Sequence, residues 1–148
     1  MAENNGSGAR DLAEPAGAVL LLSPQVIERI EETRAYMHEH AGEPLTLSVL
    51  SSVAALSPWY LVRVFKAHVG VPPHRYLTTL RLEGARRLLE SSSFSVTQIA
   101  HRTGFGSVSH FSTVFRTRVG VSPSQYRKRH LRWLWEEDEE ALPGAALA

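Results

Sequence analysis

The stretch HVGVPPHRY at residues 68–76 decides the fold, because it recurs as RVGVSPSQY at residues 118–126. The two copies share Val, Gly, Val, Pro and Tyr at the same places. Glycine commonly ends a helix in the left-handed conformation, and proline is favoured in the first turn of the next helix. Each copy therefore predicts the end of one helix and the beginning of another.

The repeat continues upstream of both copies. LSVLSSVAALS at residues 47–57 corresponds to VTQIAHRTGFGS at residues 96–107, and the apolar letters match at an offset of 49. After the turn the offset is 50, because the second unit carries one extra residue near Ser107. Two short helices joined by a turn of three or four residues are typical of a helix-turn-helix. The chain is therefore predicted to contain two such units.

Capping residues mark the expected helix starts, since Ser and Thr are favoured before a helix and Pro at its first position. These signals lie at Ser23-Pro24, Thr46, Ser57-Pro58, Pro73 and Ser95. The helix that begins at Pro73 is predicted to run to about Ser91. Its expected apolar stripe is Tyr76, Leu77, Leu80, Ala85, Leu88 and Leu89.

We predict an all-α fold, a bi-lobed domain of about seven helices in which a linker helix joins two helix-turn-helix units. The expected parts are a disordered N-terminal tail at 1–22, a first helix-turn-helix lobe at 23–80, a linker helix at 73–91, a second helix-turn-helix lobe at 92–130 and an acidic C-terminal tail at 131–148. The expected core residues are Leu61, Phe65, Tyr76, Phe105, Phe111, Phe115 and Tyr126.

Charge is distributed unevenly along the chain, although the net charge is only +1. Residues 1–44 carry 3 basic and 8 acidic side chains, residues 45–132 carry 13 and 2, and residues 133–148 carry no base and 5 acids. A basic block with few acids repels itself, and a polyanion partner would relieve that repulsion. This distribution favours a polyanion partner over a merely solvated surface, on which helices normally mix both signs.

Several classes of function are not expected. The absence of cysteine excludes disulfides and thiol nucleophiles, and the seven histidines are scattered, so we expect no metal, no cofactor and no catalytic residues. The longest apolar run, AGAVLLL at residues 16–22, is too short to span a bilayer, so we expect no membrane partner and a cytoplasmic protein.

From Leu45 to Arg129 the sequence resembles the DNA-binding domain of the AraC/XylS family of bacterial transcription regulators. The stretch SVTQIAHRTGFGSVSHFSTVFRTRVGVSPSQYR at residues 95–127 carries the motifs I-A-x-x-x-G-F, S-H-F-S-x-x-F-R and G-x-S-P-x-x-Y-R. The resemblance implies seven helices whose two recognition helices enter successive major grooves on one face of the DNA. A linker helix of about 18 residues spans roughly 27 Å, which suits grooves about 34 Å apart.

Two positions in the first unit depart from the family pattern. Ala55 stands where the family usually has glycine in the turn, whereas the second unit keeps Gly104. Ser51 stands where the family usually has alanine in the preceding helix. Both residues are small, so we expect an altered turn rather than a broken one, with a cost of about 1 kcal/mol for Ala at positive φ.

By position in the motif, the first recognition helix presents the base-reading candidates Trp59, Val62 and Arg63. An arginine can bind guanine with two hydrogen bonds, so Arg63 is the foremost candidate. A phosphate contact or a surface ion pair is the alternative for Arg63, and a packing role is the alternative for Trp59. Ser57 and Lys66 are expected at the DNA backbone.

The second recognition helix offers short side chains. Its base-reading candidates are Val108, Ser109, His110 and Thr113, and its backbone candidates are Ser107, Ser112, Arg116 and Arg118. His110 has a capping or core role as its alternative. Because none of the base-reading candidates can grip guanine bidentately, we expect the first unit to carry most of the direct readout and the second to position the protein.

The remaining arginines and lysines are expected to add to the positive field, about half of them by touching phosphates. They are Arg81, Arg86, Arg87, Arg102, Arg127, Lys128, Arg129 and Arg132. The C-terminal segment is expected to dock Trp133, Leu134 and Trp135 on the second lobe or on a partner. Its EEDEE run at residues 136–140 is either a weak competitor of DNA or a solvated terminus.

The expected partners are double-stranded DNA and, for an activator, RNA polymerase, with the protein bound as a monomer; repression is the alternative. Some DNA-repair methyltransferases carry a related module, but they need a reactive cysteine that this chain lacks. Only 22 residues precede the first helix, so no small-molecule effector domain is evident. The chain is either a stand-alone regulator or a fragment of a larger effector-sensing one. A helical protein-interaction module without DNA binding is the remaining alternative.

Overall fold

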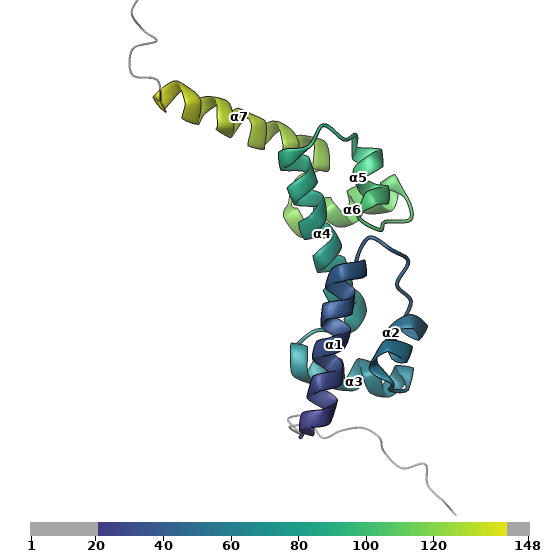
Figure 1. Ribbon diagram of the computed structural model, residues 1–148. Coiled ribbons are helices and arrows are strands. Elements are labelled where there is room, and N and C mark those ends of the chain that lie inside the picture. The colour runs from purple at the N-terminus through teal and green to yellow at the C-terminus, as the bar shows by residue number, and fades with distance from the viewer. Residues whose placement is uncertain (1–20, 142–148) are drawn as a thin grey trace, which may run out of the picture.

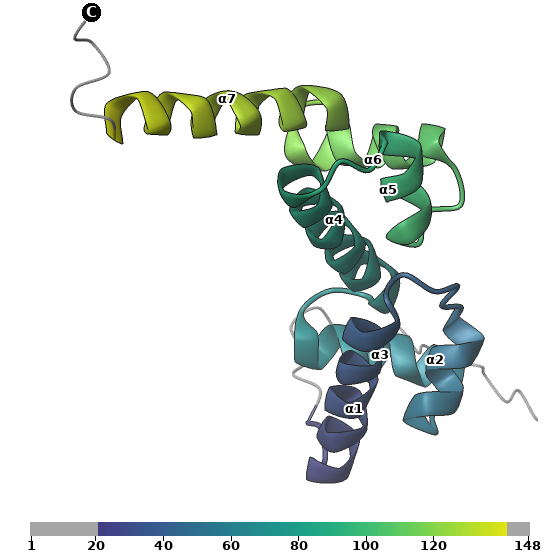
Figure 2. The same ribbon diagram turned by 45° about the horizontal axis from the view of Figure 1, so that its top comes forward.

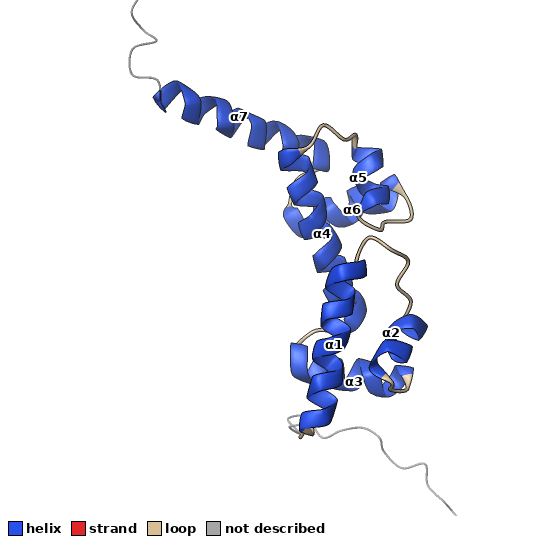
Figure 3. Ribbon diagram, in the orientation of Figure 1, coloured by secondary structure: helices blue, strands red, loops and turns tan. Residues whose placement is uncertain are grey.

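The computed structural model describes the backbone of residues 21–141 and the side chains of residues 21–132. Over this range the chain forms helices and loops and no strand (Figure 3). The helices are α1 (Pro24–His40), α2 (Leu47–Ala54), α3 (Pro58–Val69), α4 (Pro73–Ser91), α5 (Val96–Arg102), α6 (Val108–Val119) and α7 (Pro123–Ala141). The prediction of an all-α fold with seven helices is confirmed.

The helices form two lobes joined by α4 (Figure 1). Helices α1, α2 and α3 pack together in the first lobe, and α5 packs with α6 in the second. Helix α4 packs against α3 at one end and against α5 and α7 at the other. Helix α4 therefore links the two lobes, as predicted for the linker helix.

Each lobe has its own apolar core. The first core holds Phe65, Leu61 and Met37, all fully buried, and the second holds Phe111 and Phe115. The tyrosines of the repeated motif, Tyr76 and Tyr126, lie half-buried against the first and second core respectively. The predicted core residues are thus shared between two separate clusters, and no single core spans the molecule's described part.

Helix α4 contributes to both cores, and its apolar stripe differs from the predicted one. Leu77 and Leu80 lie in the first core, whereas Leu82 and Leu89 lie in the second. The predicted stripe omitted Leu82, which is 5% exposed, and included Leu88, which is only half-buried. A single 3.6-residue period misses this arrangement because the buried face of α4 changes direction where it passes from one lobe to the other.

The predicted caps are confirmed at the start of the helices. The hydroxyls of Ser23, Thr46, Ser57 and Ser95 each accept a hydrogen bond from a backbone N–H in the first turn of the following helix. Gly70 and Gly120 end α3 and α6 in the left-handed conformation, with φ of 97° and 94°. The repeated stretch therefore marks the same helix boundary in both lobes.

Ala55 adopts the left-handed conformation expected of it, with φ 54° and ψ 41°. Among the described residues it is the one non-glycine residue at positive φ. The Ser51 hydroxyl donates a hydrogen bond to the carbonyl of Leu56, and Arg29 Nη1 donates one to the carbonyl of Ala55 at 3.2 Å. These bonds hold the altered turn closed.

Replacing Ala55 by glycine is expected to stabilise the first lobe. Glycine removes the steric strain that the Ala55 Cβ causes at positive φ, but it also raises the entropy of the unfolded chain. The net increase in the free energy of unfolding is about 0.5–1 kcal/mol. Thermal unfolding should show a midpoint a few degrees higher. The control is Ala67→Gly on the exposed face of α3, which should lower stability by about 1 kcal/mol. A destabilising Ala55→Gly would contradict the strain argument.

Helix α7 continues without a break across the boundary predicted at residue 130, and its C-terminal part extends away from the second lobe (Figure 2). Leu131 on this helix is 44% exposed. The predicted docking of Trp133, Leu134 and Trp135 and the EEDEE run lie outside the described side chains. Residues 1–20 of the tail predicted at 1–22 lie outside the described residues. Of the remaining two, Leu21 is exposed and Leu22 packs partly against the first core.

No single helix between residues 21 and 141 is long and apolar enough to cross a membrane. The bent pair of α2 and α3 reaches that composition only when the two are joined across a 78° bend.

Candidate nucleic-acid interface

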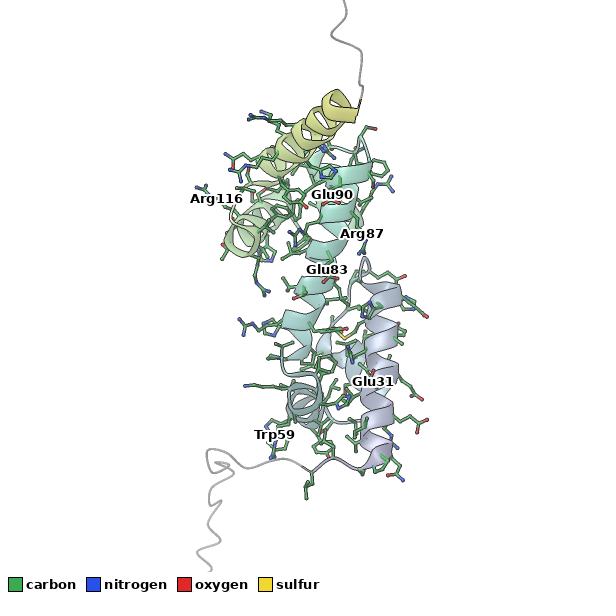
Figure 4. The ribbon with its side chains drawn as sticks, turned by 90° about the vertical axis from the view of Figure 1, so that its left-hand side faces the viewer. Glu31, Trp59, Glu83, Arg87, Glu90 and Arg116 are labelled. Carbon is green, nitrogen blue, oxygen red and sulfur yellow. The ribbon has the colours of Figure 1, made fainter. Side chains whose placement is uncertain are left out.

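The two predicted recognition helices, α3 and α6, face the same side of the molecule. Figure 4 shows Trp59 on α3 and Arg116 on α6 toward one edge of the view, with α1 and its Glu31 at the opposite edge. Each helix has 12 residues and is capped by a serine, so the positive end of each helix dipole lies at the same kind of position. One side of the molecule therefore displays side chains from both helices (Figure 4).

Trp59 and Arg63 form a pair on the outer side of α3. The Trp59 side chain is 58% exposed, so it does not pack in the lobe core. The Arg63 guanidinium lies over the indole, 4.9 Å from the ring centroid. The four-residue spacing puts the two on one face of the helix. A cation–π contact of this kind holds the long arginine side chain in place before any ligand arrives.

Val62 lies differently from its two neighbours. It is half-buried and lines an apolar cavity of about 140 Å³ together with Leu47 of α2 and Leu77 of α4. Its methyl groups therefore face the junction of three helices. Of the three base-reading candidates in the first unit, the structure brings Trp59 and Arg63 together and leaves Val62 turned toward this cavity.

The second recognition helix is capped by Ser107, whose hydroxyl accepts a hydrogen bond from the backbone N–H of His110 at 3.1 Å. Val108 packs partly against the second core. The imidazole of His110 is exposed, and its centroid lies 6.1 Å from that of Phe105. Ser109 and Thr113 are exposed. The accessible side chains at this end of α6 are therefore short and polar.

The backbone candidates are mostly accessible. Lys66, Arg116 and Arg118 are exposed, and Ser112 is half-buried. The Ser57 and Ser107 hydroxyls accept cap bonds, which leaves each hydroxyl proton available as a donor.

Four of the arginines expected to add to the field also contact groups inside the fold. Arg102 lies over the ring of Phe94, with its guanidinium carbon 3.9 Å from the centroid. Arg86 lies over the ring of Tyr126 at 5.5 Å. Arg127 donates to the carbonyls of residues 89 and 92. Arg81 donates to two carbonyls of the loop between α1 and α2.

Sequence reasoning missed the roles of Arg81, Arg86 and Arg127 because their contacts join residues 35 to 40 positions apart in the chain. The signal for Arg81 was weak but present: it lies in the middle of a helix between two apolar positions, Leu80 and Leu82, that are both buried. Burial lowers the pKa of the Arg81 guanidinium from its usual value. The group therefore belongs to the fold as well as to the positive field.

Two features of an active site are not found among the described residues. No three His, Asp or Glu side chains gather closely enough to hold a metal ion in this part of the chain. Every buried side-chain nitrogen or oxygen described has a hydrogen-bond partner. The surface that stands out is the shared face of α3 and α6.

A family model described as "Helix-turn-helix domain" matches residues 50–129, which cover most of the first unit, the linker helix and the second unit. A transcriptional regulator of Chromobacterium violaceum with an AraC-type DNA-binding domain has a solved structure that superposes on this chain with a TM-score of 0.65. It is 32% identical, and the match covers 70% of this chain and 93% of that one. The chain belongs to the AraC family of helix-turn-helix proteins.

Other members support the assignment. The DNA-binding domain of AdpA, solved in complex with a target DNA, superposes on this AraC-family chain with a TM-score of 0.67 at 34% identity, covering 69% of this chain and 92% of that one. The transcriptional activator RhaS of Enterobacter sp. (strain 638) is 36% identical over 133 residues. That match covers 85% of this chain and 48% of RhaS, so the chain spans about half the length of this relative.

Proposed function

We propose that this AraC-family chain is a sequence-specific DNA-binding transcription regulator that inserts α3 and α6 into successive major grooves of double-stranded DNA. The observation that carries the proposal is the common orientation of the two recognition helices, with Trp59 and Arg63 displayed on the first (Figure 4). The AdpA domain that it resembles was solved on its target DNA. The 13 basic side chains of residues 45–132 supply the charge that a duplex requires.

The two units contribute unequally to base reading. Arg63 on α3 reads guanine, held by Trp59 at the position seen here. The short side chains of α6 contact the bases less extensively; they are Ser109, His110 and Thr113. Val108 reaches the bases least, because it packs partly on the second core. The backbone contacts come from Ser57, Lys66, Ser107, Ser112, Arg116 and Arg118. Val62 contributes least to the first unit, because it faces the apolar cavity.

In vitro selection of bound duplexes tests the proposal. The selected sequences should contain two half-sites about 10–10.5 base pairs apart from centre to centre. The half-site under α3 should show the stronger sequence constraint and should include a guanine. Equal selectivity in both half-sites would refute the unequal division of labour. Failure to enrich any sequence at low salt would refute DNA recognition itself.

Replacing Arg63 by alanine should weaken binding to the selected site by about 1–3 kcal/mol and relax the preference at one position. The loss is position-specific because a bidentate contact to one base disappears. Titration of labelled duplexes that carry each of the four bases at that position measures it. The matched control is Lys66→Ala on the same helix, which should weaken binding to all four duplexes alike. The same uniform loss for Arg63→Ala would assign this arginine to phosphate.

The remaining parts of the proposal concern the cell. The regulator activates transcription, in line with the activator name of RhaS. It binds as a monomer, works in the cytoplasm and contacts RNA polymerase. Because the chain spans 48% of RhaS, it also fits the DNA-binding part of a larger effector-sensing regulator. Retention on heparin followed by a gel shift on random duplex separates these readings from a helical interaction module without DNA binding.

A further inference from the structure

The two lobes meet beside the middle of α4, away from either apolar core. The loop that follows α1 in the first lobe reaches toward the turn between α5 and α6 in the second (Figures 1 and 2). Arg81 of α4 lies where these two segments approach each other. Its Nε donates to the carbonyl of Ala41 at 2.8 Å, and its Nη2 donates to the carbonyl of Glu43 at 2.9 Å. One guanidinium therefore ties the first lobe's loop to the linker helix.

The second lobe also packs against the Arg81 guanidinium. Gly104, at φ +93°, has no side chain, and a Cβ built there would lie 2.6 Å from Arg81 Nε and 2.7 Å from the Ala41 oxygen. A Cβ on Gly42 of the first lobe would lie 2.8 Å from the carbonyl oxygen of Arg102. The backbones of the two lobes thus come into contact at two glycines, with the Arg81 hydrogen bonds between them.

This seam is small and polar. The two apolar cores do not merge across it, and a cavity of about 430 Å³ lined by Arg81, Gly42, Gly84 and Arg102 opens beside it. Burial lowers the pKa of the Arg81 guanidinium, as expected for a cation enclosed between segments of backbone. The orientation of one lobe relative to the other therefore depends on α4 and on a few contacts in which Arg81 is central.

We propose that Arg81 is a positioning residue that locks the two lobes in one orientation and so determines the half-site spacing that α3 and α6 can read. The planar guanidinium fits this role because its donors point in fixed directions and reach two carbonyls at once. Without it the loop after α1 loses both bonds, and the lobes rotate about α4. The DNA consequence rests on the proposed function, whereas the lock itself is a property of the free protein.

The lock is tested first without DNA. The chain has no cysteine, so single cysteines at the exposed positions Glu32 in α1 and Ser124 in α7 can carry two spin labels. Double electron–electron resonance should give a narrow distribution of inter-lobe distances in the otherwise unchanged protein. Arg81→Ala should broaden it markedly. Arg75→Ala is the matched control, because it removes the same charge from an exposed position of α4 and should leave the distribution narrow.

Two further variants separate the lock from loss of charge or of fold. Arg81→Lys keeps the charge but not the two directed donors, so it should also broaden the distribution. Gly104→Ala disturbs the same seam from the second lobe and should have the same effect. Circular dichroism establishes that each variant is folded, and Gly104→Ala serves if Arg81→Ala does not fold. Distributions in the folded seam variants as narrow as that of the parent would overturn the proposal.

The DNA arm compares the selected duplex with one carrying a single inserted base pair between the half-sites. The parent protein should discriminate strongly against the insertion, which displaces and rotates one groove relative to the other. For Arg81→Ala, affinity for the selected duplex should fall about tenfold if one-tenth of the molecules keep the competent orientation. Its discrimination between the two duplexes should nearly vanish. Full discrimination by Arg81→Ala would overturn the proposal, whereas absence of binding by the parent would overturn the proposed function alone.

Discussion

Raising the salt concentration from 50 to 200 mM is expected to weaken binding to duplex DNA by about 10³–10⁵-fold. This range follows for 6–10 phosphate contacts, since each contact releases a counterion and the affinity falls with a slope of about −0.9 per contact. The supply of cations is sufficient, because residues 45–132 carry 13 basic side chains. Arg81, Arg86, Arg102 and Arg127 contact groups within the fold, which leaves nine of the 13 basic side chains of this segment for these contacts.

Fluorescence anisotropy with a labelled duplex at four salt concentrations measures this slope. Arg116→Ala on the exposed side of α6 should reduce the magnitude of the slope by about 1, because one phosphate contact is lost. Arg81→Ala should change the slope less, because Arg81 donates to backbone carbonyls between the lobes. A slope shallower than about −2 would mean that the positive face does not meet the DNA backbone as proposed.

Replacing Phe115 by alanine is expected to unfold the second lobe and leave the first one folded. Phe115 is fully buried, with its ring centroid 5.6 Å from that of Phe111 and 5.5 Å from that of Tyr126. Loss of such a side chain costs about 3–5 kcal/mol, which is a large share of the stability of a small domain. Because the two cores are separate, the cost falls on one of them.

Amide hydrogen exchange resolved by residue measures the outcome. Protection should disappear from α5 and α6 and persist in α1, α2 and α3. The DNA footprint should shrink to the half-site under α3. Phe65→Ala is the corresponding experiment for the first lobe. Phe65 occupies the equivalent place in the first core, with its ring centroid 5.6 Å from that of Tyr76. Simultaneous loss of protection in both lobes would show that they fold as one cooperative unit.

The local features of the fold were predictable because their causes are local. Ser23, Thr46 and Ser57 each satisfy a backbone donor within three residues along the chain, so a serine or threonine before an apolar pattern marks a helix start by itself. The positive φ of Ala55 was likewise predictable from its place in the repeated turn. Matching the two copies of the motif was enough to place the lobes and the linker helix in order.

The candidate interface was predictable only in part. The positions of Trp59 and Arg63 on one face of α3 follow from helical spacing, but their contact with each other was not anticipated. Val62 shares the same helix and is grouped with them by the sequence, yet it lines an apolar cavity with residues of α2 and α4 and is half-buried. Exposure of a residue on an amphipathic helix depends on which neighbours pack beside it, and no pattern within the helix reports that.

The sequence alone determined the two helix-turn-helix units, the boundaries of their helices and the strongly basic segment. It could do so because caps, turns and charges depend on residues close together in the chain. The tertiary structure alone decided which arginines contact groups within the fold. Arg81 reaches carbonyls 40 and 38 residues earlier in the chain, and Gly104 lies against it from the other lobe. Such contacts form only when distant segments are brought together, so the separation of the two recognition helices is a property of the packed molecule.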